Sequence, residues 1–408
     1  MRSIPIILFT LFPILLFSQA KYTFMYEKGF SAHSGAENLI ATNYIYATID
    51  KKYIPTNIFK EKKVVGKLGN MAYRFAKFWY IDFELSAWAF RTQHEYFGHT
   101  VRAKQAGYYD AWPVIGYPYY SKDKGLTYRG ERIGYSSVHE NKLINSGGNE
   151  ANSILAENIF AKSLLSNRIL YQQSLLYIGN NTYQSLGILL ANNISDIHDI
   201  KYYNKYIIYN ANEEKLQKQF ETIALIELLT DPLNYFSLYS IFKNYIYEGK
   251  HETKIPMLRI GGKLRYLPDF RYVLAPYSPE LMYENYFRFD KKLLRITFRH
   301  AALTLHKSFG ITVKLYNYSI SKHFSFDSQI SYWDQPEIKI YNDSNEKIVF
   351  DEKGLGLAFI QSTYYRFVNK NDFSLMLALG YKAGGYLEGE ILDKGLILRG
   401  GLSFRFDK

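Results

Sequence analysis

The sequence predicts an α+β protein with a mainly helical N-terminal part and a C-terminal antiparallel β-barrel of about eight strands. Near Lys250 the period of the apolar residues changes from about 3.6 to 2, which marks a passage from helices to strands. Aromatic residues make up 17% of the 408 residues, an excess typical of barrels at a membrane interface. Hydrophobic residues at 47% and charged residues at 22% suit a packed core and argue against global disorder.

Three segments follow from this pattern. Residues 1–20 have the form of a secretory signal peptide, with Arg2, an apolar stretch over residues 4–17 and small residues at Ser18 and Ala20. Residues 21–250 are the expected helical domain and residues 251–408 the expected barrel domain. The net charge of +12 suits an anionic membrane or lipopolysaccharide surface, and no nucleic-acid-binding module is visible.

Helical periodicity is expected in three regions of the N-terminal part. The first covers residues 67–106 and ends near Gly107, the second begins at Glu150, and the third covers residues 217–247 with an interruption at Asp231-Pro232. Residues 111–135 are rich in proline, glycine and tyrosine and predict a loop with a short hairpin of residues 117–120 and 125–128.

The first helical region contains the sequence Gln93-His94-Glu95-Tyr96-Phe97-Gly98-His99. Cysteine is absent, so any transition-metal site must use His, Asp and Glu, and two imidazoles beside a carboxylate suit a zinc hydrolase. On a regular α-helix, residues i and i+5 point roughly 140° apart. The two histidines can therefore face one ion only if the turn holds an extra residue. We expect a π-helical turn here, a distortion that a glycine tolerates.

The spacing of His94, Glu95, Gly98 and His99 resembles the HExxGH motif of the dipeptidyl peptidase III family of zinc exopeptidases. The resemblance implies a zincin-like domain in which His94 and His99 bind Zn²⁺, Glu95 is the general base and a later glutamate is the third ligand. Glu150 follows His99 by 51 positions (150 − 99) and takes that place. The resemblance covers only this motif and one spacing, and the glutamate-rich second motif of the family matches only at Glu150.

Several residues compete for the remaining roles. Glu157 lies nearly on the same helical face as Glu150 and is the alternative third ligand, or a partner of a ligand histidine. Tyr120, Tyr135 and His139 are candidate oxyanion donors, among which the sequence does not choose. The cluster over residues 196–199 is interpreted as a surface loop.

Beyond residue 257, segments about ten residues long alternate apolar and polar residues. Strands are expected, among others, at residues 258–266, 281–289 and 293–301. The last segment places Leu396, Leu398, Leu402, Phe404 and Phe406 on one face, and Arg399, Ser403 and Arg405 on the other. Long strands, aromatic strand ends and this amphipathic final strand resemble an outer-membrane β-barrel, whose closure leaves no free strand edge in lipid. The pattern departs from the usual terminal signal because Asp407 and Lys408 follow the last aromatic residue.

Together these observations predict a zinc-dependent metallopeptidase of the bacterial outer membrane, with its helical domain in the periplasm and a metal-activated water that attacks a peptide or protein substrate. The expected partners are that substrate, outer-membrane lipid and lipopolysaccharide. One alternative is a non-catalytic outer-membrane barrel with a helical domain, for binding, transport or envelope structure, in which the histidines only pack. Another is a soluble periplasmic protease with a β-sandwich. Convergence of His94, His99 and Glu150 on one point distinguishes the enzyme from the first alternative.

Overall fold

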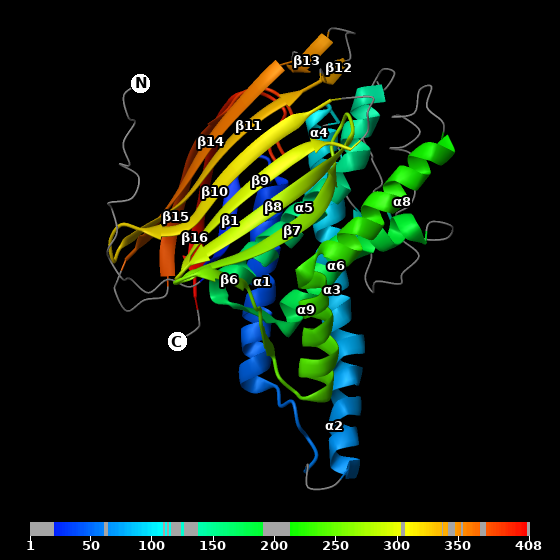
Figure 1. Cartoon of the computed structure of the whole chain (residues 1–408), viewed down its shortest axis with the longest axis vertical. Helices are drawn as coiled ribbons and strands as arrows, with labels where there is room; N and C mark the ends of the chain where they lie inside the picture. The colour runs from blue at the N-terminus through cyan, green and yellow to red at the C-terminus, as the bar shows by residue number, and fades with distance from the viewer. Residues whose placement is uncertain are drawn as a thin grey trace.

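One large antiparallel sheet with helices on one side of it forms the architecture, seen in a computed structural model (Figure 1). The structure describes residues 20–60, 64–108, 111, 114–115, 124–125, 138–190, 213–302, 307–336, 338–341, 347–351, 354–367 and 373–405. All of the expected signal peptide except Ala20, and the cluster at residues 196–199, lie outside the described residues.

The helices include a continuous rod built from five consecutive elements. These are α2 (Val64–Lys77), the π-helix η1 (Phe78–Asp82), α3 (Phe83–Arg91), the π-helix η2 (Thr92–Thr100) and α4 (Val101–Gln105). The other helices are α1 (Ala32–Tyr53), α5 (Val138–Ser166), α6 (Tyr171–Leu189), α8 (Glu213–Thr230), α9 (Pro232–Leu238) and the π-helix η3 (Tyr239–Tyr247).

The helical regions expected from the sequence are present, with one difference. The rod matches the first region and α8 to η3 match the third, with the expected break at residue 231, where the Asp231 carboxylate accepts hydrogen bonds from the backbone N–H groups of Leu233 and Asn234. The second helix begins at Val138 rather than at Glu150. Glu150 is therefore in the middle of a helix, where neighbouring helices can bury its side chain.

The large sheet has ten strands. In the order in which they pair, they are β1 (Tyr22–Glu27), β16 (Gly395–Phe404), β15 (Phe373–Lys382), β14 (Gly354–Arg366), β11 (Phe324–Gln335), β10 (Phe309–Ser319), β9 (Lys292–Ala301), β8 (Pro279–Phe289), β7 (Leu264–Leu274) and β6 (Leu258–Gly261). The expected strand over residues 258–266 is a hairpin instead, because Gly262 adopts a positive φ of 49° and turns the chain between β6 and β7.

Three short strand pairs accompany the sheet. They are β2 (Val114–Ile115) with β3 (Lys124–Gly125), β4 (Arg168–Leu170) with β5 (Glu252–Lys254), and β12 (Ile338–Tyr341) with β13 (Lys347–Asp351). The hairpin expected between the first two helical regions is thus β2 with β3, formed a few residues earlier than predicted.

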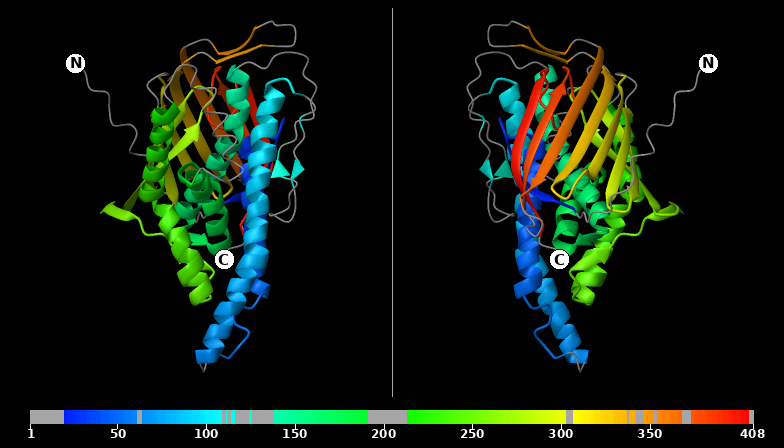
Figure 2. Two further views of the ribbon diagram at one scale, coloured as in Figure 1. Left: turned by 90° about the vertical axis from the view of Figure 1, so that its right-hand side faces the viewer. Right: turned by 90° about the vertical axis from the view of Figure 1, so that its left-hand side faces the viewer.

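The prediction of a closed barrel of about eight strands is wrong for the described residues. The sheet is open, with β1 and β6 at its edges, and β1 joins it from the N-terminal part of the chain. The physical reason is that helix α5 occupies the inner side of the sheet (Figure 2). Tyr316 on β10 donates a hydrogen bond to Glu157 on α5 at 3.0 Å, and Arg288 on β8 donates to the Leu164 carbonyl at 2.7 Å. Side chains alone fill the interior of an eight-stranded barrel, so a closed barrel of that size has no room for α5.

The two faces of the sheet are inverted relative to a soluble protein. Along β15, Phe373, Leu375, Leu377, Leu379 and Tyr381 are exposed, while the alternate residues are mostly buried. The same alternation on other strands exposes Tyr283, Phe298, Val313, Ile330, Leu357, Phe359 and Leu398. The buried inner face carries the charges, namely Arg271, Glu280, Glu284, Arg295, Arg299, Lys382 and Arg399.

The rod and the helices around it show the same inversion. Trp79, Tyr80 and Leu85 are exposed. Lys77 is buried, and its ammonium nitrogen lies 2.9 Å from an Asp50 oxygen and 2.8 Å from an Asp82 oxygen. Among the described residues, no helix combines the length and the low polarity that crossing a bilayer requires.

The main apolar core lies between α1, α5 and the inner face of the sheet. It includes Ile40 and Tyr44 on α1, Phe160 on α5 and Tyr286 on β8, all nearly inaccessible to solvent. Phe404 belongs to this core and packs near the Tyr44 ring, with centroids 6.3 Å apart, whereas Leu396, Leu398 and Leu402, which were expected on the same face, are exposed. The domain boundary near residue 250 stays a prediction, but this core takes residues from both sides of it.

Candidate functional site: a buried histidine pair

The motif residues His94 and His99 lie on the π-helix η2, which confirms the expected distortion. A π-helix bonds residue i to residue i+5 and so places two residues at this spacing on one side. The Nε2 atoms of the two imidazoles are 3.1 Å apart, and the ring planes meet at 79°. Both side chains are buried, with exposed fractions of 4% and 3%.

Three glycines bring η2 against α5 at this point. A Cβ atom on Gly98 would lie 2.6 Å from the Gly147 carbonyl oxygen and from the Gly148 Cα. A Cβ atom on Gly148 would lie 2.5 Å from the Nε2 atoms of both His94 and His99. From the sequence, Gly98 is expected to tolerate the distorted turn. The structure adds that these glycines permit close helix approach, which brings α5 onto the imidazole edges.

The outer ring nitrogens of the pair are fixed by hydrogen bonds. His99 donates from Nδ1 to the Ile144 carbonyl at 2.7 Å, which leaves its Nε2 as an acceptor. The Asn152 side-chain nitrogen lies 2.9 Å from Nδ1 of His94 and donates to it, so Nε2–H of His94 donates to His99. The Asn152 oxygen is buried without a partner. Rotating this amide would make Nδ1 of His94 a donor and aim both Nε2 lone pairs at one point.

Glu150, the expected third ligand, forms an ion pair with the guanidinium group of Arg102 in this structure. Arg102 on α4 donates to Glu150 through Nε at 2.8 Å and through a second nitrogen, and the Gly389 backbone N–H donates to the same carboxylate at 2.6 Å. Burial lowers the pKa of Arg102, but the Glu150 carboxylate outweighs it and the pKa is raised above its ordinary value. The ligand role of Glu150 stays a prediction, and the contacts seen are those of a buried ion pair.

The remaining candidates lie apart from the imidazoles or outside the described residues. Glu157 faces the sheet, where it pairs with Arg295 and accepts a hydrogen bond from Tyr316. Glu95 is half-buried on η2. Tyr120, Tyr135 and the His139 side chain lie outside the described residues.

The histidine pair fits two positions of a zinc site. Two nitrogen ligands of one tetrahedral zinc ion are roughly 3.3 Å apart, given Zn–N bonds of about 2.0–2.1 Å, and the observed separation is 3.1 Å. A catalytic zinc site takes three protein ligands. Within the described ranges, no group of three or more His, Cys, Asp or Glu residues is placed to hold a metal ion. Among the described residues, the histidine pair thus supplies two of the three protein ligands that such a site takes.

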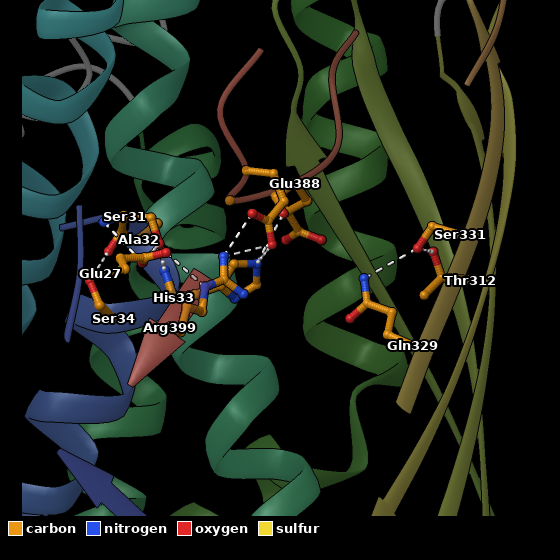
Figure 3. Close-up of polar contacts among 12 residues, drawn as sticks. Glu27, Ser31, Ala32, His33, Ser34, Thr312, Gln329, Ser331, Glu388 and Arg399 are labelled. Atoms are coloured by element: carbon orange, nitrogen blue, oxygen red, sulfur yellow. Dashed lines mark hydrogen bonds and ion pairs between the residues drawn. The ribbon is translucent and has the colours of Figure 1, made fainter. Parts of the chain in front are cut away.

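A second polar feature is a cavity of ≈ 90 Å³ between α1, α5 and the sheet. On this measure one water molecule needs only about 10–15 Å³. The residues with titratable side chains among those that line it include Lys21, His33, Glu37, Lys162, Lys314, Asp327 and Arg399. Figure 3 shows His33 and Arg399 on the side of the helices, and Gln329, Ser331 and Thr312 on the opposite strands.

Ion pairs among β1, β16, α1 and the segment around Glu390 border this cavity. Arg399 donates to Glu27 at 2.7 Å and to Glu390 at 2.7 Å, and His33 Nε2 lies 3.4 Å from Glu390. Burial lowers the pKa of His33, against the opposing effect of Glu390, so the imidazole is neutral at pH 7. The cavity is a polar space inside the sheet that a small ligand can occupy.

Sequence reasoning missed Arg102 and Asn152, which hold Glu150 and His94. A signal existed for Arg102, because it follows His99 by three positions on a helix that buries its motif face. No local signal existed for Asn152, since its contact depends on how α5 packs against η2.

Comparisons with known proteins give no assignment. No protein-family model matches the chain, and no curated protein matches it. Among solved structures, the NanC porin in a rhombohedral crystal form is similar at 12% sequence identity and a TM-score of 0.27, over 37% of this chain and 76% of the porin chain. This overlap is too loose to carry a conclusion about fold or function.

Proposed function

We propose that this protein is a non-catalytic integral protein of a bacterial outer membrane, held in lipid by the outward face of its ten-stranded sheet. The observation that carries the proposal is the inversion of that sheet, which buries its charges and exposes its leucines and aromatic residues. In a water-exposed antiparallel sheet, the apolar side chains face the core and the polar ones face solvent.

The energetics favour lipid as the occupant of the outer face. Leu396, Leu355 and Leu398 are 83%, 69% and 62% exposed, and removing each such side chain from water contributes roughly 1.5–3 kcal/mol. Soluble monomers rarely expose contiguous apolar patches larger than a few hundred Å², and this face extends over most strands of the sheet. Lipid acyl chains can cover such a face, and no specific protein partner is then required.

Strand length and aromatic positions support the same occupant. Strands β7 to β10 have ten or eleven residues, which span roughly 36 Å, or about 25 Å at a tilt of 45°. That height matches the apolar band of outer-membrane proteins. Phe324, Tyr365 and Phe373 lie outward at one end of three neighbouring strands, where an aromatic girdle is expected.

The inner side of the sheet is filled by a helix and ion pairs, which supports a role in ligand binding or envelope structure rather than as an open channel. α5 lies along the inner face, and Arg271 binds both Glu284 on the sheet and Glu388. The cavity beside α1 is the space in which a ligand can bind. The ends of α1 and α2 extend past the sheet (Figure 1), and we expect them to lie in the periplasm.

Fractionation of the native protein tests the proposal. We expect the full-length chain to sediment with outer membranes, to resist extraction by carbonate and urea, and to enter solution only with detergent. A periplasmic protein exported in the same cells is the control for lysis. Recovery of the folded chain in the soluble fraction without detergent would overturn the proposal.

A second candidate function is zinc-dependent peptide hydrolysis, favoured by one observation, the approach of the His94 and His99 Nε2 atoms to 3.1 Å. For this candidate we expect zinc to co-purify with the protein. Gly148→Ala should lower zinc occupancy, because the new Cβ would lie 2.5 Å from both Nε2 atoms and push the imidazoles apart. Gly187→Ala on α6 is the matched control, since nothing lies within 4 Å of its Cβ position. Metal content is measured by mass spectrometry of elements.

Two further variants separate binding from chemistry in this candidate. Glu95→Gln should keep the metal and lose peptidase activity, because the amide cannot accept the proton of a bound water. His99→Gln should lose the metal. A folded wild-type protein that takes up no zinc after incubation with it would reject the hydrolase and leave the membrane proposal intact.

A further inference from the structure

Three arginines lie side by side at the end of the sheet where β6, β7 and β8 meet. Arg259 pairs with Arg265 across β6 and β7, and Arg265 pairs with Arg288 across β7 and β8. Residues directly opposite each other in neighbouring strands point to the same face. The three guanidinium groups therefore form one row, which we call the arginine row.

Within the part of the chain that the structure describes, no carboxylate forms an ion pair with the arginine row. Among the described residues, none of the three guanidinium groups lies within 4 Å of a carboxylate oxygen. Arg259 donates to the Gly262 carbonyl at 3.0 Å and Arg288 to the Leu164 carbonyl at 2.7 Å. The nearby Asp290 carboxylate lies 3.6 Å from the Lys263 ammonium. Like charges directly opposite each other destabilise a sheet, so an external anion would relieve this arrangement.

Arg259 and Arg265 are exposed and Arg288 is buried, and all three line an open hollow at the edge of the apolar outer face. The hollow is lined by Arg259, Gly262, Lys263, Arg265, Arg288 and Asp290, four cationic groups against one carboxylate. On the same strands, the outward residues Leu258, Ile260 and Phe289 are exposed by 63%, 56% and 42%. Cationic and apolar groups thus meet at one rim, as the headgroup and acyl chain of a lipid do.

We propose that the arginine row binds the phosphate group of an anionic lipid headgroup at the membrane boundary. This inference rests on the proposed function, in which the outer face lies in lipid. Guanidinium groups bind phosphate through paired N–H donors. The apolar residues beside the row favour a lipid over a free anion, because only a lipid has acyl chains that can cover them.

Calorimetric titration of the full-length protein in a neutral detergent tests the inference. The probes are short-chain phosphatidylglycerol, short-chain phosphatidylcholine and inorganic phosphate. We expect phosphatidylglycerol to bind at least tenfold more tightly than phosphatidylcholine, since each basic residue near an anionic lipid adds to the attraction. The double variant Arg259→Gln with Arg265→Gln should lose that preference.

A charge-matched control is available on the helices. Lys104→Gln with Lys218→Gln removes two exposed positive charges away from the row and should keep the preference. Equal binding of the two phospholipids, or an unchanged preference in the arginine variant, would overturn the headgroup site. Phosphate binding as tight as that of phosphatidylglycerol would overturn lipid as the occupant. Fractionation tests the membrane proposal separately, so the two failures are distinguishable.

Discussion

Replacing Leu377 by arginine is expected to destabilise the protein in a bilayer by about 2–4 kcal/mol. Leu377 lies at the centre of β15 with an outward side chain that is 47% exposed. In lipid, its replacement places a guanidinium near the midplane, where a charge on the outer face is most costly. The measurement is the free energy of unfolding in phosphatidylcholine vesicles, from urea titration monitored by tryptophan fluorescence.

The matched control is Leu396→Arg at the start of β16, an outward leucine at a strand end. There the same change should cost no more than about 1 kcal/mol, since the penalty falls toward the interface. If the face were covered by water, both substitutions would shift stability by only about 0.5 kcal/mol. Equal and small effects at the two positions would therefore contradict a lipid-facing sheet.

Replacing Arg102 by methionine is expected to destabilise the protein by about 3–5 kcal/mol. The Arg102 side chain is 3% exposed and binds Glu150, the Gln105 side chain and the Glu390 carbonyl. Its removal leaves the Glu150 carboxylate buried, with the Gly389 N–H as its remaining hydrogen-bond donor among the described residues. Chemical unfolding in detergent measures the loss.

The double variant Arg102→Met with Glu150→Gln separates a structural ion pair from a metal ligand. A neutral amide keeps an acceptor for Gly389 and removes the uncompensated charge, so it should recover a large part of the lost stability. If Glu150 were instead a zinc ligand, Arg102→Met would free the carboxylate and raise zinc occupancy. Higher occupancy together with unchanged stability would contradict the ion-pair role.

Local sequence patterns were sufficient for the helical rod, for the region from α8 to η3 and for the unusual turn between the histidines. The five-residue spacing of His94 and His99 predicts a π-helix because no regular helix places both on one side, and the helix is present. The same spacing predicted a metal site, but the partner of Glu150 depends on Arg102 and on the strand-free segment around Gly389. Those contacts join residues 48 and 239 positions apart, which local patterns do not relate.

The alternation of the C-terminal strands also predicted which residues share a face. It did not predict the burial of Phe404 in β16: the strand pairs with β1 and β15 without a register shift, but Phe404 at its end is covered by Phe24 and Tyr44. Nor did it predict that the sheet stays open. Closure depends on what occupies the interior, and α5 with its ion pairs occupies it here.

By itself the sequence determined the change from helices to strands near residue 250, the apolar and polar sides of most C-terminal strands and the distorted histidine turn, because each follows from residue spacing along one segment. Only the tertiary structure decided three features. The sheet includes a strand from the N-terminal part of the chain, it stays open around α5, and Glu150 forms an ion pair with Arg102. These features depend on contacts between segments that are distant in the sequence. Local spacing is equally compatible with an open or a closed sheet and with several partners for Glu150, and charge pairing and the volume of the interior determine which one forms.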